Sequence, residues 1–101
     1  MRPKPDYDHR RLDDVLHSRL RLAIAAALAA VDEMEFSALR DLVGATDGNM
    51  TTHTRRLEEE GYIEVRKRFV GRKPCTSYRL TKKGKAALAA YVEELGKFIG
   101  K

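Results

Sequence analysis

The apolar positions of this chain recur at helical spacing in its first half, alternate as in a strand further on, and return to helical spacing near the end. Over 12–31 they fall at steps of three and four residues, which predicts a first helix with these bounds. Residues 1–11 show no such periodicity and are predicted to form a flexible N-terminal arm. Residues 12–99 are therefore expected to form a single domain.

Two short helices are predicted after the first. Residues 36–43 repeat the helical spacing over about two turns, and Gly44 is expected to end this helix. A second short helix is predicted over 47–60, with Thr46 or Asp47 capping its exposed amides. Two short helices joined by a tight turn are typical of a helix-turn-helix, which presents its second helix outward.

A hairpin and a long helix complete the pattern. Residues 62–70 alternate apolar and charged side chains, residues 76–80 alternate again, and 71–74 lie between them as a turn. An antiparallel hairpin is therefore predicted over 62–80. From about 82 to 99 the helical spacing returns. The predicted fold class is mainly α with a small antiparallel β-hairpin.

The last helix is long for so small a chain. At 1.5 Å per residue it reaches about 27 Å, further than a two-turn helix and a hairpin can cover. Part of its apolar stripe, with part of the first helix, is therefore predicted to meet a second copy of the chain. The residues predicted at this dimer interface are Leu16, Leu88, Tyr91, Val92, Leu95, Phe98 and Ile99.

Charge is distributed unevenly over the 101 residues. The chain carries 20 Lys and Arg against 15 Asp and Glu, a net charge of +5. Residues 61–85 hold nine basic groups and one acidic group, whereas residues 31–60 hold three basic and eight acidic groups. This asymmetry favours a surface for a polyanion, although a solvated charged hairpin is the alternative. With 43% hydrophobic residues, the chain is expected to be globular.

The second short helix and the hairpin carry the candidate binding residues. Near the start of the helix, hydroxyl, amide and guanidinium groups lie opposite the core-facing Met50, and such groups bind base edges or phosphates. We therefore predict a recognition helix over 47–60 in the major groove and a wing over about 66–75 on the phosphate backbone or in the minor groove. The predicted DNA contacts are Asn49, Thr51, Thr52, Arg55, Arg56, Arg66, Arg68, Arg72 and Lys73.

Three further residues have two interpretations each. His53 lies at the edge of the core-facing side, where it either packs or contacts a phosphate. Lys82 and Lys83 stand in the first turn of the last helix, where cations oppose the helix dipole. They have either no role there or an anionic neighbour.

Catalysis is not expected. The three histidines are dispersed, and the single Cys75 allows neither an internal disulfide nor a paired-thiol metal site. We therefore predict no enzyme activity, no cofactor and no metal, with oxidation sensing by Cys75 as a minor alternative. The longest apolar run, 22–31, is about half of a membrane span, and the chain start lacks a secretory signal, so a cytoplasmic protein without membrane contact is expected.

A wider pattern combines these elements. It is carried by Arg21-Leu22, Ile24, Leu28, Phe36, Leu39, Asp47 to His53, Leu57-Glu58, Gly61 to Ile63, Phe69 to Pro74, Thr76, Leu80-Thr81 and Gly84. Over about 13–95 the chain resembles the winged-helix DNA-binding domains of small prokaryotic transcriptional regulators, of the MarR/ArsR-like kind. Thr54 departs from the resemblance, since relatives tend to carry an apolar residue there.

The resemblance implies a winged helix-turn-helix that dimerises through its N- and C-terminal helices and controls transcription. Two recognition helices would then lie in successive major grooves of double-stranded DNA, about 34 Å apart. The alternative is a winged-helix adaptor that binds protein and not DNA, which the cationic surface disfavours. The sequence pattern assigns no small-molecule effector.

Overall fold

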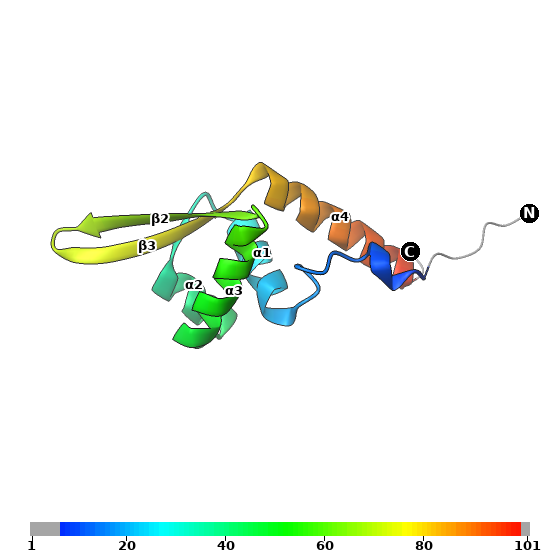
Figure 1. The fold of residues 1–101 in the computed structure, drawn as a ribbon, viewed down its shortest axis with the longest axis horizontal. Coiled ribbons are helices and arrows are strands. Elements are labelled where there is room, and N and C mark those ends of the chain that lie inside the picture. Colours follow the sequence, from blue (N-terminus) through cyan, green and yellow to red (C-terminus); the bar gives the residue numbers. More distant parts are fainter. Residues whose placement is uncertain (1–6, 100–101) are drawn as a thin grey trace, which may run out of the picture.

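Four α-helices and a small sheet make up residues 7–99, which the computed structural model describes (Figure 1). The helices are α1 (Arg19–Ala29), α2 (Phe36–Val43), α3 (Asp47–Glu59) and α4 (Lys82–Phe98), and a short 3-10 helix, η1 (His9–Arg11), precedes them. The strands are β1 (Met34–Glu35), β2 (Ile63–Val70) and β3 (Lys73–Leu80), in the antiparallel order β1-β3-β2. The predicted winged helix-turn-helix is confirmed.

The first helix is shorter than predicted. The prediction of a helix over 12–31 is wrong at its start, because two side chains satisfy backbone amides locally. Asp13 accepts hydrogen bonds from two following backbone amides at 2.8 and 3.0 Å, which folds the segment into turns. Ser18 then caps α1 by accepting a hydrogen bond from the amide of Arg21.

The N-terminal arm is described only in part. Residues 1–6 of the predicted arm lie outside the described residues. Beyond them, Asp8 caps η1, so the last part of the arm is helical. The ring of Tyr7 packs edge-on against Phe98 at a centroid distance of 6.3 Å, and Arg11 lies 3.5 Å from the carboxylate of Glu94. The described part of the arm therefore runs beside the far end of α4 (Figure 1).

The core lies where α1, α2 and α3 meet the base of the hairpin. Its fully buried apolar side chains are Leu16, Ile24, Leu28, Leu39, Met50 and Leu57. Each such side chain contributes about 1.5–3 kcal/mol by leaving water. Thr54 is buried among them and donates its hydroxyl to the carbonyl of Met50 at 2.6 Å, so its polar group is satisfied.

The hairpin is confirmed, with a tighter turn than predicted. Phe69 pairs with Pro74 and Val70 with Lys73, which leaves only Gly71 and Arg72 in the turn. Gly71 has a φ of +66°, the left-handed conformation that two-residue hairpin turns require at this position.

Strand β1 was not predicted. Residues 32–35 form a polar break in the sequence, yet Met34 pairs with Tyr78 and Glu35 with Ser77 of β3. Two residues are too few to show the alternation of a strand, so the sequence pattern does not predict β1. The pairing becomes visible only in the structure, where β3 lies beside it.

The junction between α3 and α4 explains Lys83. Its Nζ donates a hydrogen bond to the carbonyl oxygen of Glu60 at 2.8 Å and lies 5.7 Å from the ring centroid of Tyr62. The negative C-terminal end of the α3 dipole therefore lies beside this cation and offsets its unfavourable position at the start of α4. Gly84, in the next position, packs so closely that a Cβ atom there would lie 2.1 Å from the carbonyl oxygen of Tyr62. Lys82 is exposed.

Candidate nucleic-acid interface

The outer side of α3 carries small polar side chains near its start. Thr46 caps the helix by accepting a hydrogen bond from the amide of Asn49 at 3.1 Å. The exposed residues of the first three turns include Gly48, Thr51, Thr52 and Arg55. Among residues 7–99, no atom outside its own turn of helix lies within 4 Å of the position that a Cβ of Gly48 would occupy. A ligand can therefore come close to the backbone at this end of the helix.

Helix α3 and the hairpin share a cleft. It has a volume of about 230 Å³, and α3 contributes Thr51 and Arg55 to it. The hairpin contributes Lys67 and Thr76, which are directly paired across β2 and β3. One exposed cation from each element therefore borders the cleft, and the exposed Glu58 of α3 borders it as well.

Lys67 is a candidate contact that the sequence analysis missed. It shares its hairpin face with Ile63 and Val65, because side chains alternate between the two faces of a strand. The alternation over 62–70 groups Lys67 with these apolar side chains, and Lys67 is not among the predicted contacts. The signal that could have found Lys67 is a charge in an otherwise apolar series, at the point where the strand leaves the core.

Arg66 and Arg68 lie on the opposite face of the hairpin. There, Glu33 accepts a hydrogen bond from Ser77 at 2.8 Å. The same carboxylate lies 3.5 Å from the guanidinium of Arg66 and 3.7 Å from that of Arg68. The chain itself therefore supplies an anion for two of the basic groups that the sequence analysis assigned to a surface for a polyanion.

Glu33→Gln is expected to strengthen binding to random-sequence DNA severalfold and to steepen its salt dependence by about two units, since it frees two guanidiniums. The measurement is the Kd for a random-sequence duplex between about 50 and 300 mM salt. Glu64→Gln is the matched control, because Glu64 is on the same hairpin face as Arg66 and Arg68 but pairs with Arg79, at 3.6 Å. Equal effects of the two changes would show that Glu33 does not restrain the arginines.

Four cations around α3 and the hairpin turn are uncompensated. Within residues 7–99, no acidic side chain forms an ion pair with Arg55, Lys67, Arg72 or Lys73. All four are exposed. They leave a run of positive charge from the helix to the tip of the hairpin.

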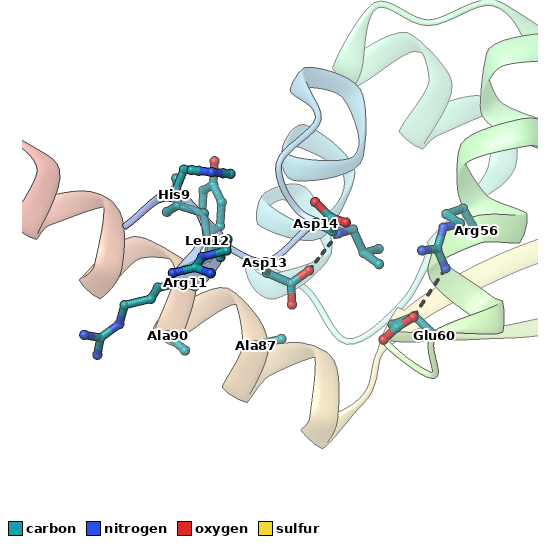
Figure 2. A pocket seen from close by; sticks show the side chains of 12 residues that line it. His9, Arg11, Leu12, Asp13, Asp14, Arg56, Glu60, Ala87 and Ala90 are labelled. Atoms are coloured by element: carbon teal, nitrogen blue, oxygen red, sulfur yellow. Dashed lines mark hydrogen bonds and ion pairs between the residues drawn. The ribbon is translucent and has the colours of Figure 1, made fainter. Parts of the chain in front are cut away.

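Arg56 and Asn49 lie apart from this run. Arg56 forms an ion pair with Glu60 at 3.3 Å. Arg56 and Glu60 border a different hollow, which lies between the N-terminal segment, the end of α3 and α4 (Figure 2). Its volume is about 650 Å³. Asn49 borders a third hollow, beside α1 and the turn after α2. The structure therefore separates these two predicted contacts from the cleft that holds Arg55.

His53 is partly buried, and its neighbour favours the packing interpretation. Its Nδ1 atom lies 3.0 Å from a guanidinium nitrogen of Arg21, and Arg21 also donates from Nε to the carbonyl of Val15 at 2.6 Å. Because a guanidinium can only donate, Nδ1 accepts. Arg21 thus connects α3 to the segment before α1.

That segment is also held at the base of the hairpin. The phenol of Tyr62 donates a hydrogen bond to the carboxylate of Asp13. Burial, together with this bond and the carboxylate charge, raises the pKa of the Tyr62 phenol well above its ordinary value. The phenol therefore stays protonated and serves as a donor.

Cys75 gains no support as an oxidation sensor. A hydrogen bond with Glu35, with desolvation as a second cause, raises the pKa of the Cys75 thiol. Oxidation proceeds through the thiolate, which a raised pKa disfavours.

The predicted dimer interface is divided by the structure. Val92, Leu95 and Ile99 are 59, 37 and 67% exposed and follow one stripe of α4. Leu88 and Phe98 are partly buried. The prediction is wrong for two residues. Leu16 is fully buried in the core of its own chain, and Tyr91 is buried with its hydroxyl 2.9 Å from Nδ1 of His17.

A family model described as a winged helix DNA-binding domain matches residues 20–99. The chain belongs to this family. A curated relative, the uncharacterized protein MJ0432 of Methanocaldococcus jannaschii, is 32% identical over 81 residues, which are 80% of this chain and 88% of the relative. No helix within residues 7–99 is long and apolar enough to cross a membrane.

Solved structures of transcriptional regulators share the winged-helix fold. A transcriptional regulator homologue from Pyrococcus horikoshii has a TM-score of 0.77 at 26% identity, and the match covers 84% of each chain. A MarR-family regulator from Silicibacter pomeroyi has a TM-score of 0.66 at 15% identity, covering 83% of this chain and 56% of its own. The regulator MOSR of M. tuberculosis, solved in complex with DNA, has a TM-score of 0.67 at 23% identity, covering 83% and 59%. The predicted winged-helix DNA-binding domain is confirmed, and its fold is shared with a MarR-family regulator.

Proposed function

We propose that this protein is a sequence-specific transcriptional regulator that binds double-stranded DNA with α3 in the major groove and the hairpin on the adjacent backbone. One observation carries the proposal: Arg55 of α3 and Lys67 of the hairpin border the same cleft, and among the described residues neither forms an ion pair, not even with Glu58, which borders the cleft too. Two elements that offer cations on one side can lie against one duplex. The role places the protein in the cytoplasm.

The contacts divide by chemistry. At the start of α3, Thr51 and Thr52 are short enough for the backbone to approach bases, and Arg55 has the forked donors that pair with guanine. Asn49 and Arg56, on the flanks of α3, suit the phosphates at the edges of the groove. In the wing, the cations at the exposed end contact phosphates. These are Lys67, Arg72 and Lys73, to which Arg66 and Arg68 add when Glu33 releases them.

A second copy of the chain completes the site. We place the dimer contact on the exposed stripe of Val92, Leu95 and the C-cap residue Ile99, because no side chain within residues 7–99 covers these three large apolar groups of α4 and its end. A two-fold axis there would present two α3 helices to one face of a duplex, with half-sites about 34 Å apart.

The test is selection of bound sequences from a random pool of duplexes. A palindrome with half-sites about ten base pairs apart is expected. Retention that does not change between about 50 and 300 mM salt would contradict DNA binding and support the protein-binding adaptor instead.

Arg55→Ala and Arg72→Ala are expected to act differently. Arg55→Ala should weaken binding to the selected site by about 1–3 kcal/mol and change binding to random DNA little, since it removes a base contact. Arg72→Ala should weaken binding to both and reduce the salt slope by about one, since it removes a phosphate contact. Titrations of both duplexes over a salt series measure this. Equal losses on both duplexes for both variants would contradict the division of roles.

A further inference from the structure

The outer end of the hairpin carries an apolar side chain in the open. Phe69 is 74% exposed and pairs across the strands with Pro74, next to the turn. Figure 1 shows the hairpin extending well beyond the helices, so the body of the chain does not cover its tip. A phenylalanine in this position contributes little to the core and is available to a partner.

Phe69 lies on the hairpin face that is turned towards α3. It is two residues beyond Lys67, and alternate residues of a strand share a face. Lys67 borders the cleft that contains Arg55. Phe69 therefore continues the cationic surface of α3 and Lys67 outward by about 7 Å. Val70, also exposed, lies on the other face.

Charge identifies the partner of this side chain. Arg68, Arg72 and Lys73 surround Phe69 in the sequence of the hairpin, and the last two have no ion pair within the described part of the chain. A second hairpin tip of this protein would bring like charges together. A duplex offers phosphates for the cations and, between its stacked base pairs, apolar faces for an aromatic ring, and minor-groove proteins commonly insert a phenylalanine or proline between base steps.

We propose that Phe69, supported by Pro74, is a wedge that enters the minor groove beside the α3 site, partly unstacks one base step and bends the DNA. The inference rests on the proposed function and adds to it a shape-dependent element of recognition. Arg72 and Lys73 hold the phosphates on either side. Pyrimidine–purine steps such as TA unstack most readily, so one is expected at a fixed position outside each half-site.

The experiment uses the full-length protein and a duplex of roughly 30 base pairs that carries the site selected by the wild type. One copy has 2-aminopurine at the expected step, whose fluorescence rises on unstacking, and another has a donor and an acceptor dye at its ends to report bending. The variants are Phe69→Ser, Phe69→Leu as a conservative replacement, and Val70→Ser as the matched control on the opposite face. Circular dichroism verifies that each variant is folded.

Phe69→Ser is expected to abolish the rise in 2-aminopurine fluorescence and the bending, and to weaken binding about tenfold with an unchanged salt slope. Phe69→Leu should retain most of both signals, and Val70→Ser should resemble the wild type. If the wild type binds the duplex tightly but Phe69→Ser bends and binds it equally well, the wedge is wrong and the proposed function stands. If the wild type binds no duplex, both are wrong.

Discussion

Leu95→Glu is expected to convert the protein to monomers and to weaken binding to the palindromic site by on the order of 100-fold, because the second half-site is then no longer bound in the same event. Leu95 is the least exposed of the three side chains on the α4 stripe, at 37%, which places it at the centre of the proposed contact. A carboxylate buried there would lack a partner and would cost more than the contact gains. Sedimentation equilibrium measures the mass, and titration of the duplex measures the affinity.

Val31→Glu is the control for the dimer. Val31 is 40% exposed and lies just beyond α1, so this change introduces the same charge at similar exposure away from the stripe. The control should keep the dimer mass. A Leu95→Glu protein that also keeps it would show that the α4 stripe is not the contact between copies.

Gly84→Ala is expected to lower the free energy of unfolding by about 3 kcal/mol or more, which is a large share of the stability of a domain of this size. An added Cβ would lie 2.1 Å from the carbonyl oxygen of Tyr62 and 2.7 Å from Cδ1 of Leu80. The first neighbour is backbone and cannot turn aside, so α4 would have to move away from the base of the hairpin. Urea denaturation followed by circular dichroism measures the change.

Gly48→Ala is the matched control for that measurement. Gly48 is also in the first turn of a helix, but nothing lies within 4 Å of its Cβ position. Alanine there should stabilise the chain by up to about 1 kcal/mol through its helix propensity. A Gly84→Ala protein as stable as the Gly48→Ala protein would mean that α4 is not held against Tyr62.

Much of the fold could be predicted because residues next to the helix termini determine where several of the helices begin or end. Gly44 caps the C-terminus of α2, and Thr46 and Thr81 cap the N-termini of α3 and α4. These termini lie within a residue or two of the predicted positions. The start of α1 could not be predicted in the same way. Its apolar spacing continues back to residue 12, but Asp13 and Ser18 divert the backbone, and periodicity does not record a competition between side-chain and helical hydrogen bonds.

The candidate site was predictable to the level of elements and less so to the level of side chains. Periodicity places Arg66 and Arg68 on one face of a strand, but Glu33, more than thirty residues earlier, decides that their charge is compensated. An apolar stripe on a helix likewise predicts that its side chains are buried, but it does not show whether they pack against the same chain or against a second copy. Leu16 and Tyr91 pack within their own chain, although the prediction placed them against a second copy.

The contacts of Lys83 and Gly84 hold the start of α4 against the end of α3 and the base of the hairpin, so a rotation at the other end of α4 is transmitted to α3. One end of this 17-residue helix is fixed to the end of α3, through the Lys83 bond to the Glu60 carbonyl, and the other end carries the stripe proposed for the dimer. Over its length of about 25 Å, a tilt of about 10° at the partner end displaces the DNA-reading helix by about 4 Å. In the proposed dimer, the crossing angle of the two α4 helices would therefore set the half-site spacing that the two copies can bind.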